Sequence, residues 1–480
     1  MKISLIPRSR EYASTVFDVV KIFQPELTWQ ELMGETDGKT VLMEIEVLAA
    51  QVLVRLTEGE WFSEPITDNE PNEVKRTIKL AVYKLLQKVL NHKGSPWGIL
   101  TGIRPTKIVH RLWDQGLEEQ EIKGVLRNKF AVSSEKISSL ITITKLQRPY
   151  IANLTDSSKV SVYISIPFCP TRCHYCSFPS FSMDQWGNHV EQYILNLIKE
   201  IKNVGLALQE QNIAVETIYM GGGTPTALTA TQLGNLLEVI NSCLRTSETL
   251  EFTVEAGRPD TINEDKLKTL KDFEVERISI NPQTMWEPTL KKIGRNHSAG
   301  DIFTTMELAR KIGFKVINMD LIVGLPGENL EIFKHTLDNI EVLKPENLTL
   351  HSLALKRTAK LRENTENLTP GCEVEKMFTY FEKWALERNY RPYYLYRQKL
   401  ILGNLENVGY CLPGLPCLYN IQMIEERQTI LGLGVGAGSK IINREDGTFR
   451  NSYNPKDLIL YNERLEEIIE AKVDKIKGLG

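Results

Sequence analysis

Residues 158–400 are predicted to form an α/β fold in which six strands, each followed by helical sequence, build a partly closed (β/α)6 barrel. Three observations lead to this prediction. Six apolar runs follow one another, most of them beginning roughly 30 to 40 residues after the run before, helical periodicity fills the intervals, and unusual residues gather directly after the runs. Because functional side chains of such barrels collect at the carboxyl ends of the strands, a site is expected there. The six runs are residues 159–168, 215–222, 250–256, 277–283, 315–324 and 347–355.

The intervals between the runs repeat apolar residues every three or four positions, as amphipathic helices do. The segments NHVEQYILNLIKEIKNV (188–204) and TATQLGNLLEVINSCLR (229–245) are clear examples. Thr229 is expected to cap the second of these helices, because a threonine side chain can accept a hydrogen bond from the first helical turn.

The segments before and after the predicted barrel lack its regular alternation of strands and helices. Residues 1–150 are predicted to be an α+β accessory domain, with strand-like alternation in 39–59 and a helical pattern in 72–92. Residues 401–480 are predicted to be a mostly irregular and helical extension that closes the barrel. Its glycine-rich segment, GLGVGAGS, does not fit the G-x-G-x-x-G pattern of dinucleotide-binding loops and is interpreted as a tight turn at the open end of the barrel.

The amino-acid composition limits the classes of protein to which this chain can belong. The chain has 480 residues, 42% of them apolar and 25% charged, with a net charge of −3, which is ordinary for a globular protein of two or three domains. No block of lysine and arginine points to nucleic acid, and no apolar run is long enough for a signal peptide or a membrane span. Seven cysteines, three of them packed together, favour metal chemistry in a reducing cytoplasm over a disulfide framework.

The packed cysteines are Cys169, Cys173 and Cys176, in the spacing Cys-x3-Cys-x2-Cys on the loop after the first run. Buried core thiols are disfavoured, because three fall within eight positions beside Pro170. Structural zinc would want four ligands, and His174 is adjacent to Cys173, where ligation by both would be strained. An iron–sulfur cluster is the third alternative: three thiolates on a four-iron cluster leave one iron open to a substrate.

The segment VYISIPFCPTRCHYCSF (162–178) resembles the radical S-adenosylmethionine (SAM) enzymes and, more narrowly, the oxygen-independent coproporphyrinogen III oxidases. The resemblance covers about residues 160 to 440. WGILTGIRPTK (97–107) and HSLALKR (351–357) are similar to the longer Gram-positive-type branch named for coproporphyrinogen dehydrogenase activity. The resemblance implies a TIM-like radical SAM barrel with a [4Fe–4S] cluster on the three cysteines. SAM would chelate the open iron, and one electron would cleave it to a 5′-deoxyadenosyl radical that abstracts a hydrogen atom.

The glycine segment YMGGGTPTAL ends the second run. On its own it is equally consistent with a tight turn between strand and helix. The resemblance implies that Gly222, Gly223 and Thr224 meet the methionine moiety of SAM.

The same resemblance implies that several polar and aromatic residues near the other strand ends contact SAM. An acid such as Asp320 in so apolar a strand is costly unless it is paired or binds a ligand, and its implied role is hydrogen bonding to the SAM ribose. Arg295, otherwise a solvated surface residue, would pair with the SAM carboxylate. Glu255 is either a helix cap or a SAM contact. The implied contacts outside the glycine segment are Tyr163, Tyr175, Glu255, Gln283, Arg295 and Asp320, and no catalytic residue is expected beyond the cluster and SAM ligands.

The resemblance implies an oxidoreductase of haem biosynthesis that converts propionates of coproporphyrinogen III to vinyl groups, giving protoporphyrinogen IX. Its partners would be the porphyrinogen and an electron donor such as a flavodoxin or ferredoxin, and Lys356, Arg357 or Arg397 could contact substrate carboxylates. Phe178 stands where the best-known oxidases carry a fourth cysteine, and some relatives with phenylalanine there handle haem rather than oxidise a porphyrinogen. A haem-binding or haem-delivery protein is therefore the second hypothesis, and a structural metal module without catalysis is the third.

Overall fold

The computed structural model describes residues 2–34, 40–57, 59–102, 104–151, 158–176, 178–354, 361, 368–398, 405–443 and 448–479. The chain divides into two compact units, Met1–Thr144 and Lys145–Gly480. Within the described ranges, none of the helices combines the length and the apolar character that a membrane crossing requires.

The N-terminal unit contains a four-stranded sheet in the order β1-β2-β3-β4. Strands β1 and β2 are parallel and the other neighbours antiparallel. Alternate residues of β3, Val52, Val54 and Leu56, are buried in the core of this unit. The elements are β1 (Lys2–Leu5), η1 (Pro7–Tyr12), α1 (Ala13–Phe23), α2 (Trp29–Leu32), β2 (Thr40–Val47), β3 (Gln51–Leu56), β4 (Phe62–Pro65), α3 (Pro71–Leu90), α4 (Thr106–Asp114), α5 (Glu119–Phe130) and α6 (Ser134–Gln147), whose last turn passes the unit boundary.

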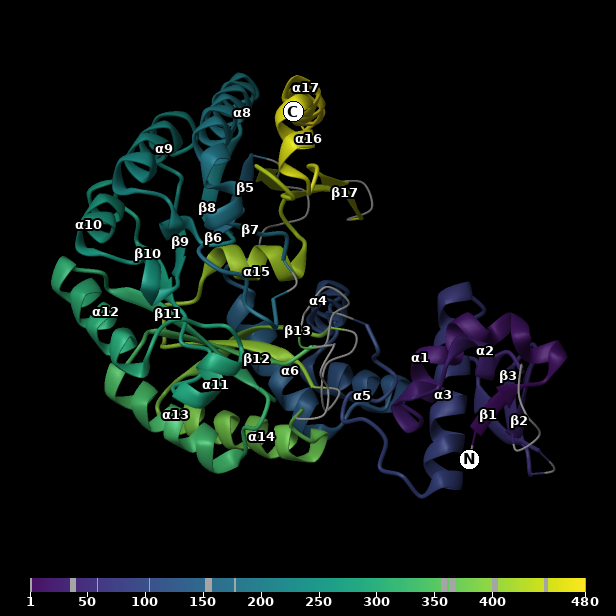
Figure 1. Cartoon of the computed structure of the whole chain (residues 1–480). Helices are drawn as coiled ribbons and strands as arrows, with labels where there is room; N and C mark the ends of the chain where they lie inside the picture. Colours follow the sequence, from purple (N-terminus) through teal and green to yellow (C-terminus); the bar gives the residue numbers. More distant parts are fainter. Residues whose placement is uncertain are drawn as a thin grey trace. The chain divides into compact units, whose positions relative to one another are not determined.

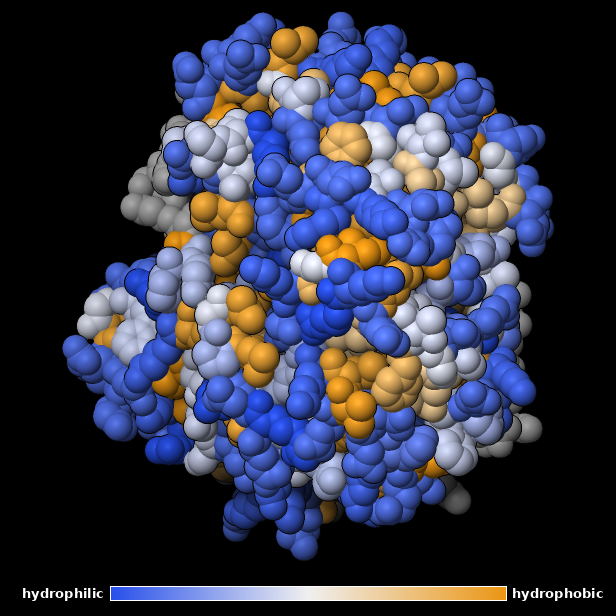
Figure 2. All heavy atoms as spheres, turned by 90° about the vertical axis from the view of Figure 1, so that its left-hand side faces the viewer, coloured by the Kyte–Doolittle hydropathy of each residue, from blue (hydrophilic) through white to orange (hydrophobic). Residues whose placement is uncertain are grey.

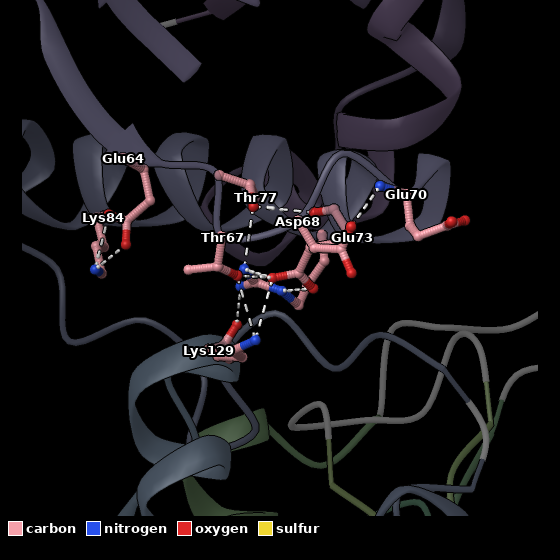
Figure 3. Close-up of polar contacts among 9 residues, drawn as sticks. Glu64, Thr67, Asp68, Glu70, Glu73, Thr77, Lys84 and Lys129 are labelled. Carbon is pink, nitrogen blue, oxygen red and sulfur yellow. Dashed lines mark hydrogen bonds and ion pairs between the residues drawn. The ribbon is translucent and has the colours of Figure 1, made fainter. Parts of the chain in front are cut away.

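A polar network ties the first turn of α3 to the end of α5 (Figure 3). Arg76 donates to both oxygens of Glu73, at 2.7 and 2.8 Å, and its Nη1 donates to the Lys129 carbonyl oxygen at 2.6 Å. The Thr67 hydroxyl donates to Glu73 Oε1 at 2.7 Å. The Glu73 carboxylate thus joins the strand-to-helix loop, α3 and α5, which are distant in sequence.

The larger unit is built around one sheet of 11 strands in the order β13-β14-β12-β11-β10-β9-β8-β5-β15-β16-β17. Its strands are β5 (Lys159–Ile166), β8 (Ala214–Gly222), β9 (Glu251–Gly257), β10 (Arg277–Ile280), β11 (Val316–Val323), β12 (Asn347–Ser352), β13 (Arg391–Tyr396), β14 (Asn407–Cys411), β15 (Ile430–Leu433), β16 (Gly438–Ile442) and β17 (Phe449–Tyr453), with a separate pair β6 (Phe168–Cys169) and β7 (Phe181–Ser182). Its helices are α7 (Met183–Trp186), η2 (Gly187–His189), α8 (Val190–Glu210), η3 (Pro225–Ala227), α9 (Ala230–Cys243), η4 (Pro259–Thr261), α10 (Glu264–Asp272), α11 (Glu287–Lys292), α12 (Ala299–Ile312), α13 (Leu330–Leu343), α14 (Gly371–Glu387), α15 (Leu418–Glu425), α16 (Leu458–Glu463) and α17 (Leu465–Lys477).

The six strands predicted from the sequence are confirmed as β5, β8, β9, β10, β11 and β12, which are parallel and lie in chain order. The C-terminal part of the chain extends this sheet on both sides. Strand β15 pairs in parallel with β5, and β14 pairs antiparallel with β12. Strands β13–β17 are not among the runs identified from the sequence. One reason is that β15 runs directly into the glycine-rich segment, whose turn joins it to β16.

The register of the strands decides which residues lie side by side on the inner face of the sheet. Strands β5 and β8 pair Ser161 with Thr217, Tyr163 with Tyr219 and Ser165 with Gly221. The alternate residues of both strands are buried and apolar, as in Val162 and Ile218. Figure 1 shows α8, α9, α10, α12 and α13 along the outer side of the sheet and α15 on its inner side. The inner face, lined by hydroxyl and polar groups, is therefore where the strand ends and α15 meet.

The outer helices present an ordinary surface to solvent. Figure 2, which faces the side that is on the left in Figure 1, shows a mainly hydrophilic surface with separate hydrophobic patches. The helices begin where the sequence indicates. Thr229 caps α9 in a reciprocal pair with Gln232, as predicted, and Ser298 caps α12 in the same way with Asp301.

Candidate functional site

The three cysteines lie on one loop that leaves strand β5. Cys169 ends β6, and Cys173 and Cys176 follow between β6 and β7. The loop folds back on itself, since Cys176 N donates to Cys173 O at 3.2 Å and Phe181 N donates to Pro167 O at 2.8 Å. All three thiols are free and half-buried.

His174 fastens this loop to the segment that follows α11. Its backbone N donates to Ile293 O at 2.9 Å. Its ring Nδ1 lies 2.8 Å from Lys292 O, and because a carbonyl oxygen only accepts, Nδ1 carries the proton. A Cβ on Gly294 would lie 3.1 Å from Nε2, so glycine is needed for this close approach. Both ring nitrogens therefore face the α11 segment, and His174 serves as an anchor of the cysteine loop.

The thiols act on one another electrostatically, as close neighbours do. Burial raises the pKa of Cys169, the Thr224 hydroxyl 3.5 Å from its Sγ opposes this, and the thiols of Cys173 and Cys176 raise the pKa further. Burial also raises the pKa of Cys176. Among the described residues, no three side chains of His, Cys, Asp or Glu converge as the ligands of a single metal ion would. Thiolates that hold an iron–sulfur cluster need no such convergence, because they bind different irons of the cluster.

Glycines 221–223 allow β8 to pass close to the cysteine loop and to Glu255. A Cβ on Gly221 would lie 2.7 Å from Glu255 Oε2, and a Cβ on Gly223 would lie 2.6 Å from Phe168 O. Gly222 has a φ of +106°, which favours glycine. Packing alone therefore requires these glycines. The turn also places Thr224 beside Cys169, with Thr224 N donating to Phe168 O at 2.8 Å.

Glu255 lies two residues before the end of β9, on the inner face of the sheet. Its Oε1 accepts a hydrogen bond of 2.6 Å from Tyr219 Oη. Burial raises the pKa of Glu255 to about 7, and the Asp320 carboxylate adds to this. Hydrogen bonds from Tyr219 and from the Gly222 backbone N–H, and the charge of His351, act in the opposite direction. Glu255 is therefore a carboxyl that changes protonation near neutral pH.

Asp320 lies two strands away, in β11. Its Oδ1 accepts a hydrogen bond of 2.8 Å from Asn318, and its Oδ2 lies 3.8 Å from His351 Nε2. Burial would raise the pKa of Asp320, but the hydrogen bond and charge of His351 and the hydrogen bonds from Asn318 and Thr349 together outweigh this, so the pKa is below its usual value. Asp320 and Glu255 thus form a pair of neighbouring carboxyls with opposite preferences, one ionised and one readily neutral.

Gln283 follows β10 and is held against β11 by the backbone. Its N donates to Asp320 O at 2.9 Å and its O accepts from Ile322 N at 3.0 Å. Its φ of +66° is uncommon for a residue other than glycine and marks a constrained position. The residue is 5% exposed, so its side chain is buried.

Arg295 reaches the cysteine loop from the segment after α11. Its Nη2 and Nε donate to Tyr175 Oη at 2.9 and 3.3 Å. Its Nη1 is buried and has no hydrogen-bond partner among the described residues. A buried guanidinium with a free donor is costly unless a ligand accepts from it.

Three tyrosines stack on the inner face of the sheet. Tyr163 of β5 and Tyr219 of β8 have ring centroids 6.3 Å apart. Tyr419 of α15 lies 6.2 Å from Tyr163 and 4.4 Å from Tyr219. Tyr163 therefore packs beneath the strand ends, whereas Tyr175 belongs to the cysteine loop.

The structure connects the sequence-predicted residues in two groups. The loop group joins the cysteines with Thr224, Tyr175 and Arg295, and the strand-end group joins Glu255, Asp320 and Gln283, with the glycines between the two. Of the expected substrate contacts, Lys356 and Arg357 lie outside the described residues, and Arg397 is buried directly after β13.

Four further residues of these groups were not among the predicted contacts: Tyr219, His351, Tyr419 and Arg258. The strand period could have identified Tyr219, because it precedes Gly221 by two residues and so lies on the same face of β8. The position of His351 opposite Ile322 depends on the pairing of β12 with β11, which the sequence does not give. Cys411 is buried at the end of β14.

Comparison with known proteins gives consistent results. Residues 163–340 match the model of the Radical SAM superfamily. The chain is 43% identical over 427 residues to the oxygen-independent coproporphyrinogen-III oxidase-like protein HemZ of Bacillus subtilis, which covers 88% of this chain and 85% of that protein. It is 40% identical over 202 residues to the heme chaperone HemW of the same organism, covering 41% of this chain and 51% of HemW.

Among solved structures, coproporphyrinogen III oxidase (HemN) of Escherichia coli superposes with a TM-score of 0.54 at 23% identity, covering 68% of this chain and 73% of HemN. This likeness confirms the fold class predicted from the sequence. Together with the extent of the match to HemZ, it shows that the chain belongs to the radical SAM superfamily and, within it, to the HemZ-like oxygen-independent coproporphyrinogen oxidase family.

Proposed function

We propose that this protein is a radical SAM oxidoreductase that converts propionate side chains of coproporphyrinogen III to vinyl groups. Cys169, Cys173 and Cys176 would hold a [4Fe–4S] cluster, and SAM would bind between the cysteine loop and the strand ends. When bound, the reduced cluster and SAM supply one-electron cleavage and a hydrogen-abstracting radical. For each propionate, a hydrogen atom would pass from the β-carbon to that radical, carbon dioxide would leave, and the remaining electron would pass to an external one-electron acceptor, which leaves a vinyl group.

The observation that carries this proposal is the unpaired Nη1 of Arg295 beside the cysteine loop. A buried cation with a free donor is suited to the carboxylate of SAM. The glycine turn packs closely against Ser165 and Phe168 and so fixes the backbone between Cys169 and Glu255, at the place proposed for SAM. The residues present therefore fit both groups.

The chain's own residues would have separate tasks in this reaction. Tyr175 holds Arg295 in position through two hydrogen bonds. The ionised Asp320, held by Asn318, is suited to accept hydrogen bonds from a ribose. The stacked tyrosines close the inner side of the sheet and keep water from the strand ends.

The decisive test is a product assay. The chain is reconstituted anaerobically with iron and sulfide, and then supplied with SAM, a strong reductant and coproporphyrinogen III. Vinyl porphyrins separated by chromatography are expected, and a Cys173→Ala variant is expected to form none. Cys372→Ala is the matched control, because Cys372 is an exposed thiol on α14. Cleavage of SAM without a vinyl product would refute the assigned substrate.

A second candidate function is haem binding or delivery without porphyrinogen oxidation. It is favoured by Phe178, which is 60% exposed directly after the cysteine loop, and by the similarity to a protein named heme chaperone. Haem bound in a one-to-one ratio, together with the absence of turnover in the product assay, would support it. A porphyrin product formed catalytically would rule it out as the main activity.

A further inference from the structure

Arg258 is a buried arginine that reaches the cysteine loop from β9. It follows Gly257, whose φ of +61° turns the chain at the strand end, and it is 4% exposed. Its carbonyl oxygen accepts from both the backbone N–H and the hydroxyl of Thr261, at 3.0 and 2.8 Å. The backbone that carries this side chain is therefore fixed.

The guanidinium itself is oriented by a carboxylate. Its Nε donates to Asp260 Oδ1 at 3.0 Å and its Nη2 donates to Asp260 Oδ2 at 2.6 Å, which is a bidentate pair. Such a pair fixes the plane of the guanidinium and leaves Nη1 pointing away from Asp260.

The remaining nitrogen, Nη1, makes all the contacts with the cysteine loop. It donates to Thr171 O at 2.8 Å and to Thr171 Oγ1 at 3.1 Å. It also lies 3.8 Å from Cys173 Sγ, within reach of a hydrogen bond to sulfur. One buried cation thus holds the loop backbone and faces the thiol at the middle of the three-cysteine sequence.

We propose that Arg258 is a positioning residue that fixes the cysteine loop and makes the cluster easier to reduce. This inference rests on the proposed function, because it requires a [4Fe–4S] cluster on Cys173. Reduction adds one negative charge to the cluster. A buried cation that donates to a ligand sulfur stabilises that added charge, and it therefore raises the reduction potential. Asp260 acts through Arg258 by holding its orientation.

The test uses the full chain with Arg258→Gln, Arg258→Lys and the matched control Arg310→Gln. Arg310 makes contacts of the same kind away from the cysteine loop: it donates to both oxygens of Glu346, at 2.8 and 2.9 Å, and to Phe314 O at 3.0 Å. Each protein is reconstituted anaerobically. The rate of iron loss to a chelator is then measured, and the midpoint potential is determined by a titration followed by electron paramagnetic resonance.

Arg258→Gln is expected to lose iron several-fold faster and to have a more negative midpoint potential. A tenfold weaker reduction equilibrium corresponds to about 59 mV for one electron. Arg258→Lys keeps the positive charge but cannot form the bidentate pair with Asp260. The midpoint potential of its cluster should therefore return towards the wild-type value, while its iron is still lost fast. Arg310→Gln should match the wild type in both measurements.

The outcomes separate this inference from the proposed function. A wild-type chain that assembles no cluster contradicts the proposed function. A full cluster with unchanged potential and unchanged iron loss in Arg258→Gln overturns the role of Arg258 alone. If Arg258→Gln folds but holds no cluster, the loop-fixing role is supported, and the potential of Arg258→Lys decides the electrostatic role. Because lysine keeps the positive charge, an Arg258→Lys potential far below that of the wild type would refute that role.

Discussion

Tyr219 Oη donates a hydrogen bond of 2.6 Å to Glu255 Oε1 and so joins the ends of two neighbouring parallel strands, β8 and β9. The contact depends on Gly221, because a Cβ at that position would lie 2.7 Å from the other carboxyl oxygen of Glu255. A strand end, a tyrosine and a glycine therefore set the position of one buried carboxyl at the candidate site.

Glu255→Gln is expected to stabilise the larger unit at pH 8 but not at pH 4. Burial raises the pKa of Glu255 from 4.5 to about 7, so the folded state holds the proton more tightly than the unfolded state does. The contribution of Glu255 to stability is therefore full below about pH 4.5 and is lost as the pH rises through about 7. Glutamine does not titrate, and the gain at pH 8 is at most about 3 kcal/mol.

This prediction is measured by urea unfolding of the wild type and the variant across that pH range. Glu248→Gln is the control, because the Glu248 side chain is 55% exposed and forms a surface ion pair with Lys159. An equal difference between Glu255→Gln and wild type at every pH would contradict the shifted pKa.

Gly221→Ala is expected to destabilise the site, whereas Gly234→Ala is expected to be neutral or stabilising. The added methyl at 221 displaces the Glu255 carboxyl and breaks its bond with Tyr219, which costs on the order of 1–3 kcal/mol. At Gly234, within α9, the nearest atom to a new Cβ is 3.6 Å away, and alanine favours the helix by about 1 kcal/mol. Unfolding curves and SAM affinity by calorimetry measure both effects. Loss of SAM binding in both variants alike would argue against a local role for Gly221.

The elements that could be predicted are those whose apolar residues recur at the regular spacing of a strand or a helix. Strand β5 could be recognised because Val162 and Ile164 alternate with Ser161 and Tyr163 and the run ends in a cysteine loop. Thr229 could be recognised as a helix cap because the capping interaction involves only Thr229 and the first turn of the helix that follows it. Strands β13–β17 carry less signal, since they are short and one of them continues into glycines.

Contacts between distant segments could not be read from one sequence. Arg258 binds Thr171 across 87 positions, and Tyr419 stacks on Tyr163 although α15 carries no pattern that places it inside the sheet. Such pairs are decided by tertiary packing, which no local period encodes. The sequence therefore predicted the cysteine loop and the strand-end residues, but not the side chains that hold them in place.

Replacing any one of Cys169, Cys173 and Cys176 by alanine is expected to abolish cluster assembly. Each thiol would be one of three protein ligands of a four-iron cluster, so two thiols leave it poorly held. Iron and acid-labile sulfide per chain should fall from about four towards zero, with loss of the visible absorbance. Cys243→Ala, at the end of α9, should leave both values unchanged. A wild-type chain that binds about one zinc and no sulfide would instead establish the structural-metal alternative.

Glu73→Gln is expected to weaken the N-terminal unit at neutral pH and to have no effect near pH 2. The hydrogen bonds from Arg76 lower the pKa of Glu73 to about 2, with Thr67 and Lys129 helping against burial. Its stabilisation is therefore present above pH 4.5 and is lost as the pH falls towards about 2. Removing the charge should cost about 1–3 kcal/mol at pH 7. Hydrogen exchange of the α3 amides measures this, and Glu64→Gln is the control, since Glu64 is exposed to a similar extent but bonds one side chain of α3, Lys84. Equal exchange in the two variants at pH 7 would show that the network in Figure 3 adds nothing beyond a single ion pair.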